Sequence, residues 1–363
     1  MKRIIGLIVF GLGVAFLVAA PLFRFYVTPK VAVAPLNQYT VSTGVGVANK
    51  MLNIPASAAA GKAVIDSNVA LTNTRYTKGD VTASQQNPAK SQNLAIYDTF
   101  SRIDTPTGLL TASSSRYAFN RTTSVLSNCC GANSGGQTVN FTGVMPLKFP
   151  FFVGKQTYQI WNDSTQSTVP AVFVDAENHA GISSYKFQQD LPATKVPGSD
   201  SQVPAKLAGQ PGAGNISVAQ YVAFQATLWI EPLTGQIIDS SVHQTQSYRG
   251  ADGATDLVVI VDANFSGQPA YVAQSAKTIK SLADQLNLVK NILPIVFLIL
   301  GIILIAVGFF VQWKGFKEQQ AAAGTDGSGP NPEDQLAQDP ATMAQPPIDP
   351  AAGPPPSTGP PQA

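Results

Sequence analysis

The chain has 363 residues, a formal net charge of +2 and a charged fraction of 12%. This low and balanced charge gives no basic surface for nucleic acid, so no nucleic-acid partner is predicted. The two cysteines, Cys129 and Cys130, are adjacent. That placement excludes the Cys-x-x-Cys spacing of zinc and thioredoxin-type sites.

Two uncharged apolar segments lie near the ends of the chain, at residues 4–23 and 292–311. A helix rises about 1.5 Å per residue, so each segment is long enough to cross a hydrocarbon core of roughly 30 Å. The first segment follows a short basic start, residues 1–3, and is longer than the apolar part of a signal peptide. It is therefore predicted to be an uncleaved anchor, and a cleaved signal peptide is the alternative.

The basic residues that flank these segments predict the orientation of the chain. Lys2 and Arg3 precede the first segment, and Lys314 and Lys317 follow the second. Because short basic ends stay on the cytoplasmic side, both termini are predicted to be cytoplasmic. The protein would then pass the plasma membrane twice, with its main domain outside the cytoplasm.

Residues 24–269 carry short runs with alternating apolar and polar side chains, separated by turn residues. Residues 156–161 alternate in this way, and residues 232–235 form a tight Pro-Leu-Thr-Gly turn between two further runs. We predict a mainly β extracytoplasmic domain, built as a curled antiparallel sheet, a barrel or a sandwich. Residues 191–215 contain four prolines and are predicted to be a long surface loop.

After the β region, the spacing of the apolar residues changes from that of a strand to that of a helix. In residues 270–291, Val272, Ala276, Ile279 and Leu286 recur at helical spacing, which predicts an amphipathic juxtamembrane helix. We expect it to pack on the base of the β domain, and the alternative is a helix on the membrane surface.

Residues 312–363 are predicted to be a cytoplasmic Pro-rich tail that is disordered, because the tail has few apolar residues to bury. Its prolines also leave open a cytoplasmic partner that binds polyproline helices.

The sequence contains no constellation of catalytic residues. A nucleophile motif of the Gly-x-Ser-x-Gly type is absent, and the two histidines are His179 and His243. Asp175, Glu177 and His179 alternate and would share one face of a strand, but a solvated hairpin edge is the favoured interpretation. The chain is therefore predicted not to be an enzyme, with no metal and no cofactor, and no ligand-binding residue is assigned.

Cys129 and Cys130 are predicted to form a local disulfide, because an oxidising exterior favours the bonded form. Free thiols are the alternative. A redox-active role is not favoured, since no Lys, Arg or His adjoins either cysteine to lower its pKa.

The segments at residues 149–158, 181–187 and 231–239, together with the N-terminal anchor, resemble a family of actinobacterial two-span envelope proteins. That family is labelled a domain of unknown function or "porin PorA family". The resemblance covers almost everything up to Lys317 and implies a porin association without a recognised catalytic residue. The layout of two terminal spans around a β domain also resembles that of CD36-type lipid receptors.

Taken together, the sequence predicts a double-anchored cell-envelope protein whose β domain binds or transfers an apolar or lipid envelope component in an interior cavity. Membrane lipids are the expected partners. The aromatic residues at 149–152, Tyr158, Trp161 and Trp229 are candidates for the cavity, although core packing is their more common role. A porin or channel component and a non-enzymatic envelope scaffold are the alternatives.

Overall fold

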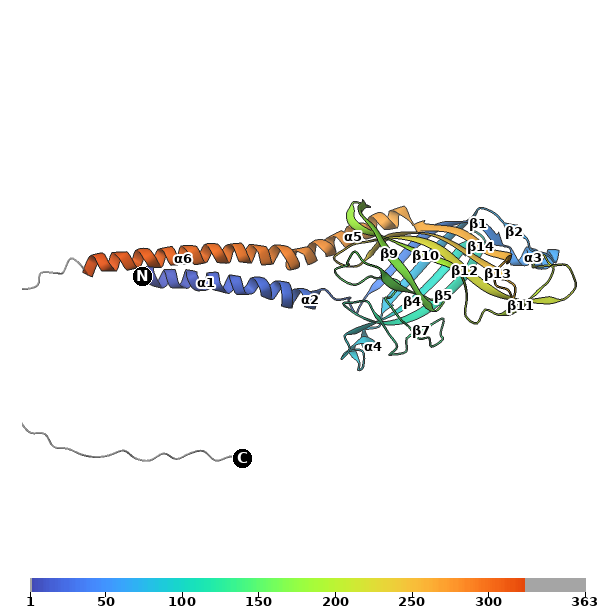
Figure 1. The fold of residues 1–363 in the computed structure, drawn as a ribbon, viewed down its shortest axis with the longest axis horizontal. Coiled ribbons are helices and arrows are strands. Elements are labelled where there is room, and N and C mark those ends of the chain that lie inside the picture. The colour runs from blue at the N-terminus through green and yellow to red at the C-terminus, as the bar shows by residue number, and fades with distance from the viewer. Residues whose placement is uncertain (1, 324–363) are drawn as a thin grey trace, which may run out of the picture.

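The computed structural model describes residues 2–323. The described chain is elongated, with a β domain at one end and a stalk of two helices that projects from it (Figure 1). Residues 324–363, which include most of the predicted tail, lie outside the described residues.

The stalk is formed by the two ends of the described chain. The N-terminal leg consists of α1 (Lys2–Leu22), the π-helical turn η1 (Phe23–Val27) and α2 (Thr28–Val31). The C-terminal leg consists of the π-helical turn η2 (Leu288–Ile292) and α6 (Leu293–Ala323). Both legs are long and apolar enough to cross a membrane. Helix α6 is longer than the predicted span, so residues 312–323 are helical and do not begin a disordered tail.

Helices α1 and α6 lie side by side and antiparallel (Figure 1), and glycines allow their backbones to approach closely. A Cβ atom added at Gly13 would lie 2.9 Å from the carbonyl oxygen of Gly301. One added at Gly308 would lie 2.9 Å from the carbonyl oxygen of Gly6. Each helix places its two glycines seven residues apart, which keeps them on one face. Small residues at such positions are a common means of packing helices in lipid.

Between the legs, the chain folds into one large antiparallel sheet that curls into a half-barrel. Eleven strands follow one another across it in the order β6-β5-β4-β3-β1-β14-β13-β12-β10-β9-β8, and β2, β7 and β11 pair beside this path. The long strands are β1 (Tyr39–Leu52), β3 (Val69–Gly79), β4 (Leu94–Thr105), β5 (Gly108–Asn120), β9 (Ser167–His179), β10 (Ile182–Lys195), β12 (Asn215–Ile230), β13 (Ile237–Arg249) and β14 (Asp256–Gly267). The short ones are β2 (Ile65–Asp66), β6 (Leu126–Ser127), β7 (Asn133–Ser134), β8 (Tyr158–Asn162) and β11 (Ser201–Pro204).

One segment joins the two edges of the curled sheet. The backbone N–H of Leu126, in β6, donates to the carbonyl oxygen of Gly143 at 2.9 Å. The next residue, Val144, exchanges hydrogen bonds with β8, through Gln159 at 2.8 Å and Trp161 at 2.9 Å. These bonds hold β6 and β8 on either side of a single extended segment, and they fix the curvature of the half-barrel there.

The predicted fold class, a mainly β domain of curled antiparallel sheet between two terminal helices, is confirmed. The predicted loop at residues 191–215 is partly wrong. Strand β10 continues to Lys195, and β11 (Ser201–Pro204) pairs with β12. The prolines are tolerated because Pro192 lies at a register shift of β10 and Pro204 ends a short strand.

Helix α5 (Pro269–Asn287) connects the sheet to the stalk, and α3 (Ile54–Ala60) and α4 (Val81–Gln85) are short. The predicted apolar face of α5 is confirmed, because Val272, Ala276, Ile279 and Leu286 are buried. Ala276 and Ile279 pack against Ile238 of β13. Helix α5 is therefore fixed to the β domain, and it sets the position of the half-barrel relative to α6.

Candidate functional site in the half-barrel

The concave face of the half-barrel encloses a cavity of about 480 Å³. Most of its wall is formed by the inner faces of β1, β3, β12, β13 and β14; β4, β8 and β10 contribute further residues, and the first turn of α5 contributes Tyr271 and Val272. The lining combines two chemistries. Its polar side chains include Gln38, Thr40, Ser42, Asn73, Gln189 and Gln244. Its apolar side chains include Ile103, Trp161, Phe224, Leu228 and Phe265.

Buried apolar residues fill the half-barrel beyond this cavity. Ala48, Leu71 and Ala263 form one cluster on the inner faces of three neighbouring strands. A second cluster, around Val218 and Val258, lies farther from the stalk along the same sheet. The cavity therefore lies toward the α5 end of the half-barrel, and these clusters pack beyond it.

The predicted aromatic residues divide between core and cavity. Phe149 and Tyr158 pack against each other and against Phe187, with ring centroids 5.0 to 5.8 Å apart, and they belong to the core. Trp161 is also mostly buried, but one part of it reaches the cavity wall. Trp229 stacks on His179 at 4.1 Å instead. Of the aromatic residues predicted for the site, Trp161 is the one that lines the cavity.

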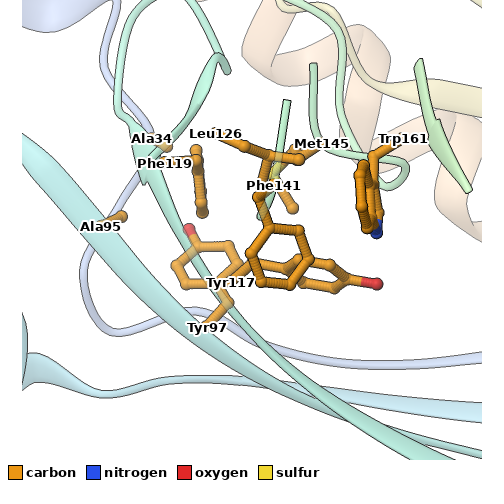
Figure 2. Packing of buried hydrophobic residues seen from close by; sticks show 9 residues of the cluster. All are labelled: Ala34, Ala95, Tyr97, Tyr117, Phe119, Leu126, Phe141, Met145 and Trp161. Atoms are coloured by element: carbon orange, nitrogen blue, oxygen red, sulfur yellow. The ribbon is translucent and has the colours of Figure 1, made fainter. Parts of the chain in front are cut away.

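Trp161 packs in a cluster of buried residues that includes Phe141 and Tyr117 (Figure 2). The Phe141 ring lies 4.9 Å from the Trp161 ring, and the indole N–H of Trp161 donates to Asp163 Oδ1 at 2.9 Å. The Tyr117 hydroxyl donates to the other oxygen of the same carboxylate. Burial, followed by the charge of Asp163, raises the pKa of Tyr117. These contacts hold Trp161 in one orientation.

Arg75 lines the cavity wall and has no carboxylate partner among residues 2–323. It lies on β3 between Asn73 and Thr77, which both line the cavity, and its side chain is half-buried. None of the ion pairs in the described part of the chain includes Arg75. The guanidinium is therefore free to bind an anion.

The acidic group of the same wall, Asp239, is already engaged. Its Oδ2 lies 2.9 Å from His179 Nε2, and its Oδ1 accepts hydrogen bonds from the backbone N–H groups of Ser240 and Gly267 at 2.7 and 3.1 Å. These contacts anchor the start of β13 to the end of β14. Asp239 thus has a structural role beside the cavity.

The residues that alternate toward His179 do not form a metal site in the structure. Glu177 accepts a hydrogen bond from the Trp229 indole at 2.5 Å, His179 contacts Asp239, and Asp175 accepts from the Ala176 backbone at 2.7 Å. Each side chain has a different partner. Within the described residues, no group of three or more His, Cys, Asp or Glu side chains is arranged to hold a metal ion.

Cys129 and Cys130 are joined by a disulfide in the structure. The pair packs against Ala89, Leu94 and Ile96, in a cluster that also includes Ala83 of α4. The disulfide therefore belongs to the packing around α4. It does not line the cavity.

A buried lysine, Lys148, lies at the edge of the cavity and is not among the residues predicted from the sequence. The Nζ atom of Lys148 donates to the carbonyl oxygens of Phe149 and Thr234 at 2.9 and 2.7 Å, and it lies 3.7 Å from the centroid of the Phe151 ring. Burial lowers the pKa of Lys148 to about 7, while the nearby charge of Glu231 opposes this shift. Lys148 holds the turn at residues 232–235 against residues 149–151.

The outer face of the half-barrel carries polar and charged side chains together with an apolar stripe of Val41, Tyr76 and Phe100, which pair across β1, β3 and β4. Side chains alternate along a strand, so the residues between those that line the cavity point outward. His243 on this face contacts Asp262 at 2.9 Å, and Arg102 pairs with Asp104. Other outward residues of the same strands are Thr74, Lys78, Gln225, Thr227 and Ser241. The charged residues on this face differ from the apolar outer band that a transmembrane barrel carries.

These features define a class: a membrane protein in which a β half-barrel with an internal cavity lies between two apolar terminal helices. Within that class, the chain belongs to the family described as Porin PorA, whose model matches residues 5–310. The family resemblance predicted from the sequence is thereby confirmed. A search of the curated proteins finds no match.

Proposed function

We propose that this protein is an envelope protein of the plasma membrane whose half-barrel binds, and presents or transfers, an amphiphilic lipid. In this proposal both termini lie in the cytoplasm and the half-barrel lies outside it, and the protein has no enzymatic activity and needs no cofactor. The observation that carries this proposal is the cavity of about 480 Å³ with its mixed polar and apolar lining. A cavity of this size lies within the usual range of small-molecule sites, roughly 300–1,000 Å³.

The position of the cavity supports a ligand that comes from the membrane. Tyr271 and Val272, in the first turn of α5, form part of its wall, and α5 leads directly into α6. The mixed lining fits a molecule with a polar group and an apolar chain better than a purely apolar one. The ligand class expected from the sequence, an apolar or lipid component, is therefore narrowed in this proposal to an amphiphile.

A pore or channel component is the second candidate, because the matching family is described as a porin. The charged pairs on the outer face, Arg102 with Asp104 and His243 with Asp262, argue against a lipid-embedded barrel built from this sheet. Recordings from planar bilayers that contain the full-length protein separate the two proposals. Discrete conductance steps at native protein loads would favour the channel.

Filling the cavity tests the binding proposal. Gln244 on β13 lines the cavity, whereas Ser241 on the same strand points outward and is exposed. We expect Gln244→Trp to reduce the amount of lipid that co-purifies with the full-length protein by several-fold, and Ser241→Trp to leave it unchanged. Mass spectrometry of extracted lipids, normalised to protein, measures this.

A wild-type protein that carries the same lipids in the same amounts as Gln244→Trp would contradict binding in the cavity. Lipids bound only to the apolar helices would co-purify in equal amounts with wild type and with both variants, because neither substitution is in the stalk. Thermal unfolding of both variants serves as the control for folding.

A further inference from the structure

Three groups from three different elements meet on one wall of the cavity. Arg75 of β3 pairs in register with Ser42 of β1, so the two side chains are neighbours on the inner face. Tyr271, from the first turn of α5, lines the same cavity; burial raises the pKa of its phenol, and the charge of Arg75 and a hydrogen bond with Ser42 oppose this rise. A guanidinium and two hydroxyls are thus available to the same volume of the cavity.

The guanidinium of Arg75 has no ion-pair partner in the described part of the chain. Asp239 on the same wall is bonded to His179 and to two backbone N–H groups. Burying a charge without a partner is costly. The planar guanidinium presents several N–H donors in a geometry that matches carboxylates and phosphates.

We propose that Arg75 binds the oxyanion of the ligand, a carboxylate or a phosphate ester, and that Ser42 and Tyr271 donate hydrogen bonds to the same group. The apolar part of the ligand then lies along Phe224, Leu228 and Phe265, which line the same cavity. This assignment rests on the proposed function and specifies its ligand: an anionic amphiphile whose charged group is bound inside the half-barrel.

Calorimetry on the full-length protein in nanodiscs tests the assignment with short-chain probes: octyl phosphate, octanoate, neutral octyl glucoside and inorganic phosphate. A charge-assisted contact of this kind corresponds to about a 10- to 100-fold difference in affinity. We expect wild type to prefer octyl phosphate and octanoate to octyl glucoside by that factor. Empty nanodiscs correct for partitioning into lipid.

Substitutions test whether Arg75 is the source of the preference for anionic probes over octyl glucoside. Arg75→Gln is expected to abolish it while octyl glucoside still binds, and Arg75→Lys is expected to retain part of it. The matched control is Lys78→Gln, which removes a positive charge from the same strand on its exposed outer face and should leave all four affinities unchanged.

The outcomes separate this assignment from the proposed function. Equal binding of octyl phosphate and octyl glucoside, unchanged in Arg75→Gln, would overturn the role of Arg75 and leave amphiphile binding intact. If inorganic phosphate binds as tightly as octyl phosphate and binds more weakly to Arg75→Gln, the oxyanion site is retained. The proposal that the ligand is an amphiphile is then overturned. Binding of none of the four probes by the folded wild type would overturn both.

Discussion

Replacing Gly235 with alanine is expected to destabilise the β domain by roughly 3–5 kcal/mol, because the change combines backbone strain with a steric clash. Gly235 has φ of +69°, in the left-handed region that side chains disfavour. An added Cβ atom would lie 2.2 Å from the carbonyl oxygen of Pro150 and 2.3 Å from that of Phe149. Both are backbone atoms, so the segment itself must move.

That movement would break a connection between distant parts of the chain. The Gly235 carbonyl accepts a hydrogen bond from the Phe149 backbone at 2.8 Å, and Lys148 bonds to both segments. Denaturant unfolding of the full-length protein, followed by tryptophan fluorescence, measures the loss. Trp161 and Trp229 both lie in the β domain and report on its folding.

Gly181 is the matched control for this experiment. It has φ of +79°, but an added Cβ atom would meet nothing within 4 Å. Gly181→Ala therefore carries the left-handed penalty alone, about 1–2 kcal/mol. Equal losses in Gly181→Ala and Gly235→Ala would contradict the close approach of residues 149–150 to the turn.

Gly13→Leu is expected to force α1 and α6 apart, with a loss of about 1–3 kcal/mol from overpacking. The added Cβ atom alone would lie 2.8 Å from the Ile305 backbone nitrogen and 2.9 Å from the Gly301 carbonyl oxygen. Because helix association in lipid depends on close packing, the neighbouring contact of Gly6 with Gly308 should also open. Spin labels on α1 and α6 measure the separation as a distance distribution.

Gly11 provides the control on the same helix. A Cβ atom added there meets nothing within 4 Å, so Gly11→Leu should leave the distance between the two helices unchanged. If the distance stays the same in Gly13→Leu as well, the glycine contact does not determine how the stalk is packed.

The sequence predicted the parts of the fold that depend on local pattern. The terminal helices follow from uninterrupted apolar runs, and the buried face of α5 follows from helical spacing. The pairing of Gly13 with Gly301 could not be found in the same way. The two glycines are far apart in the chain, and the local pattern of either apolar segment does not indicate which residues of the two helices meet.

The residues of the candidate site were still harder to predict, because they come together only through long-range contacts. Trp161 was singled out because it is aromatic and lies in a clearly alternating strand. Arg75 was not, because an arginine in a strand of alternating polarity most often faces water. Its position inside the molecule comes from the curl of the sheet, which depends on long-range pairing such as that of Gly143 with β6 and of Val144 with β8. Lys148 was missed for a similar reason, since its partner Thr234 is remote in sequence.

The proposed function requires a lipid to occupy the concave face of the half-barrel in the cell, and not its outer face. A photoreactive phenylalanine analogue placed at Gln244 or at Ser241 of the full-length protein tests this directly, because the two positions lie on opposite faces of β13. After irradiation of intact cells, intact-mass analysis should show a lipid adduct from position 244 and none from position 241. Adducts of equal yield at the two positions, or none at position 244, would contradict the account.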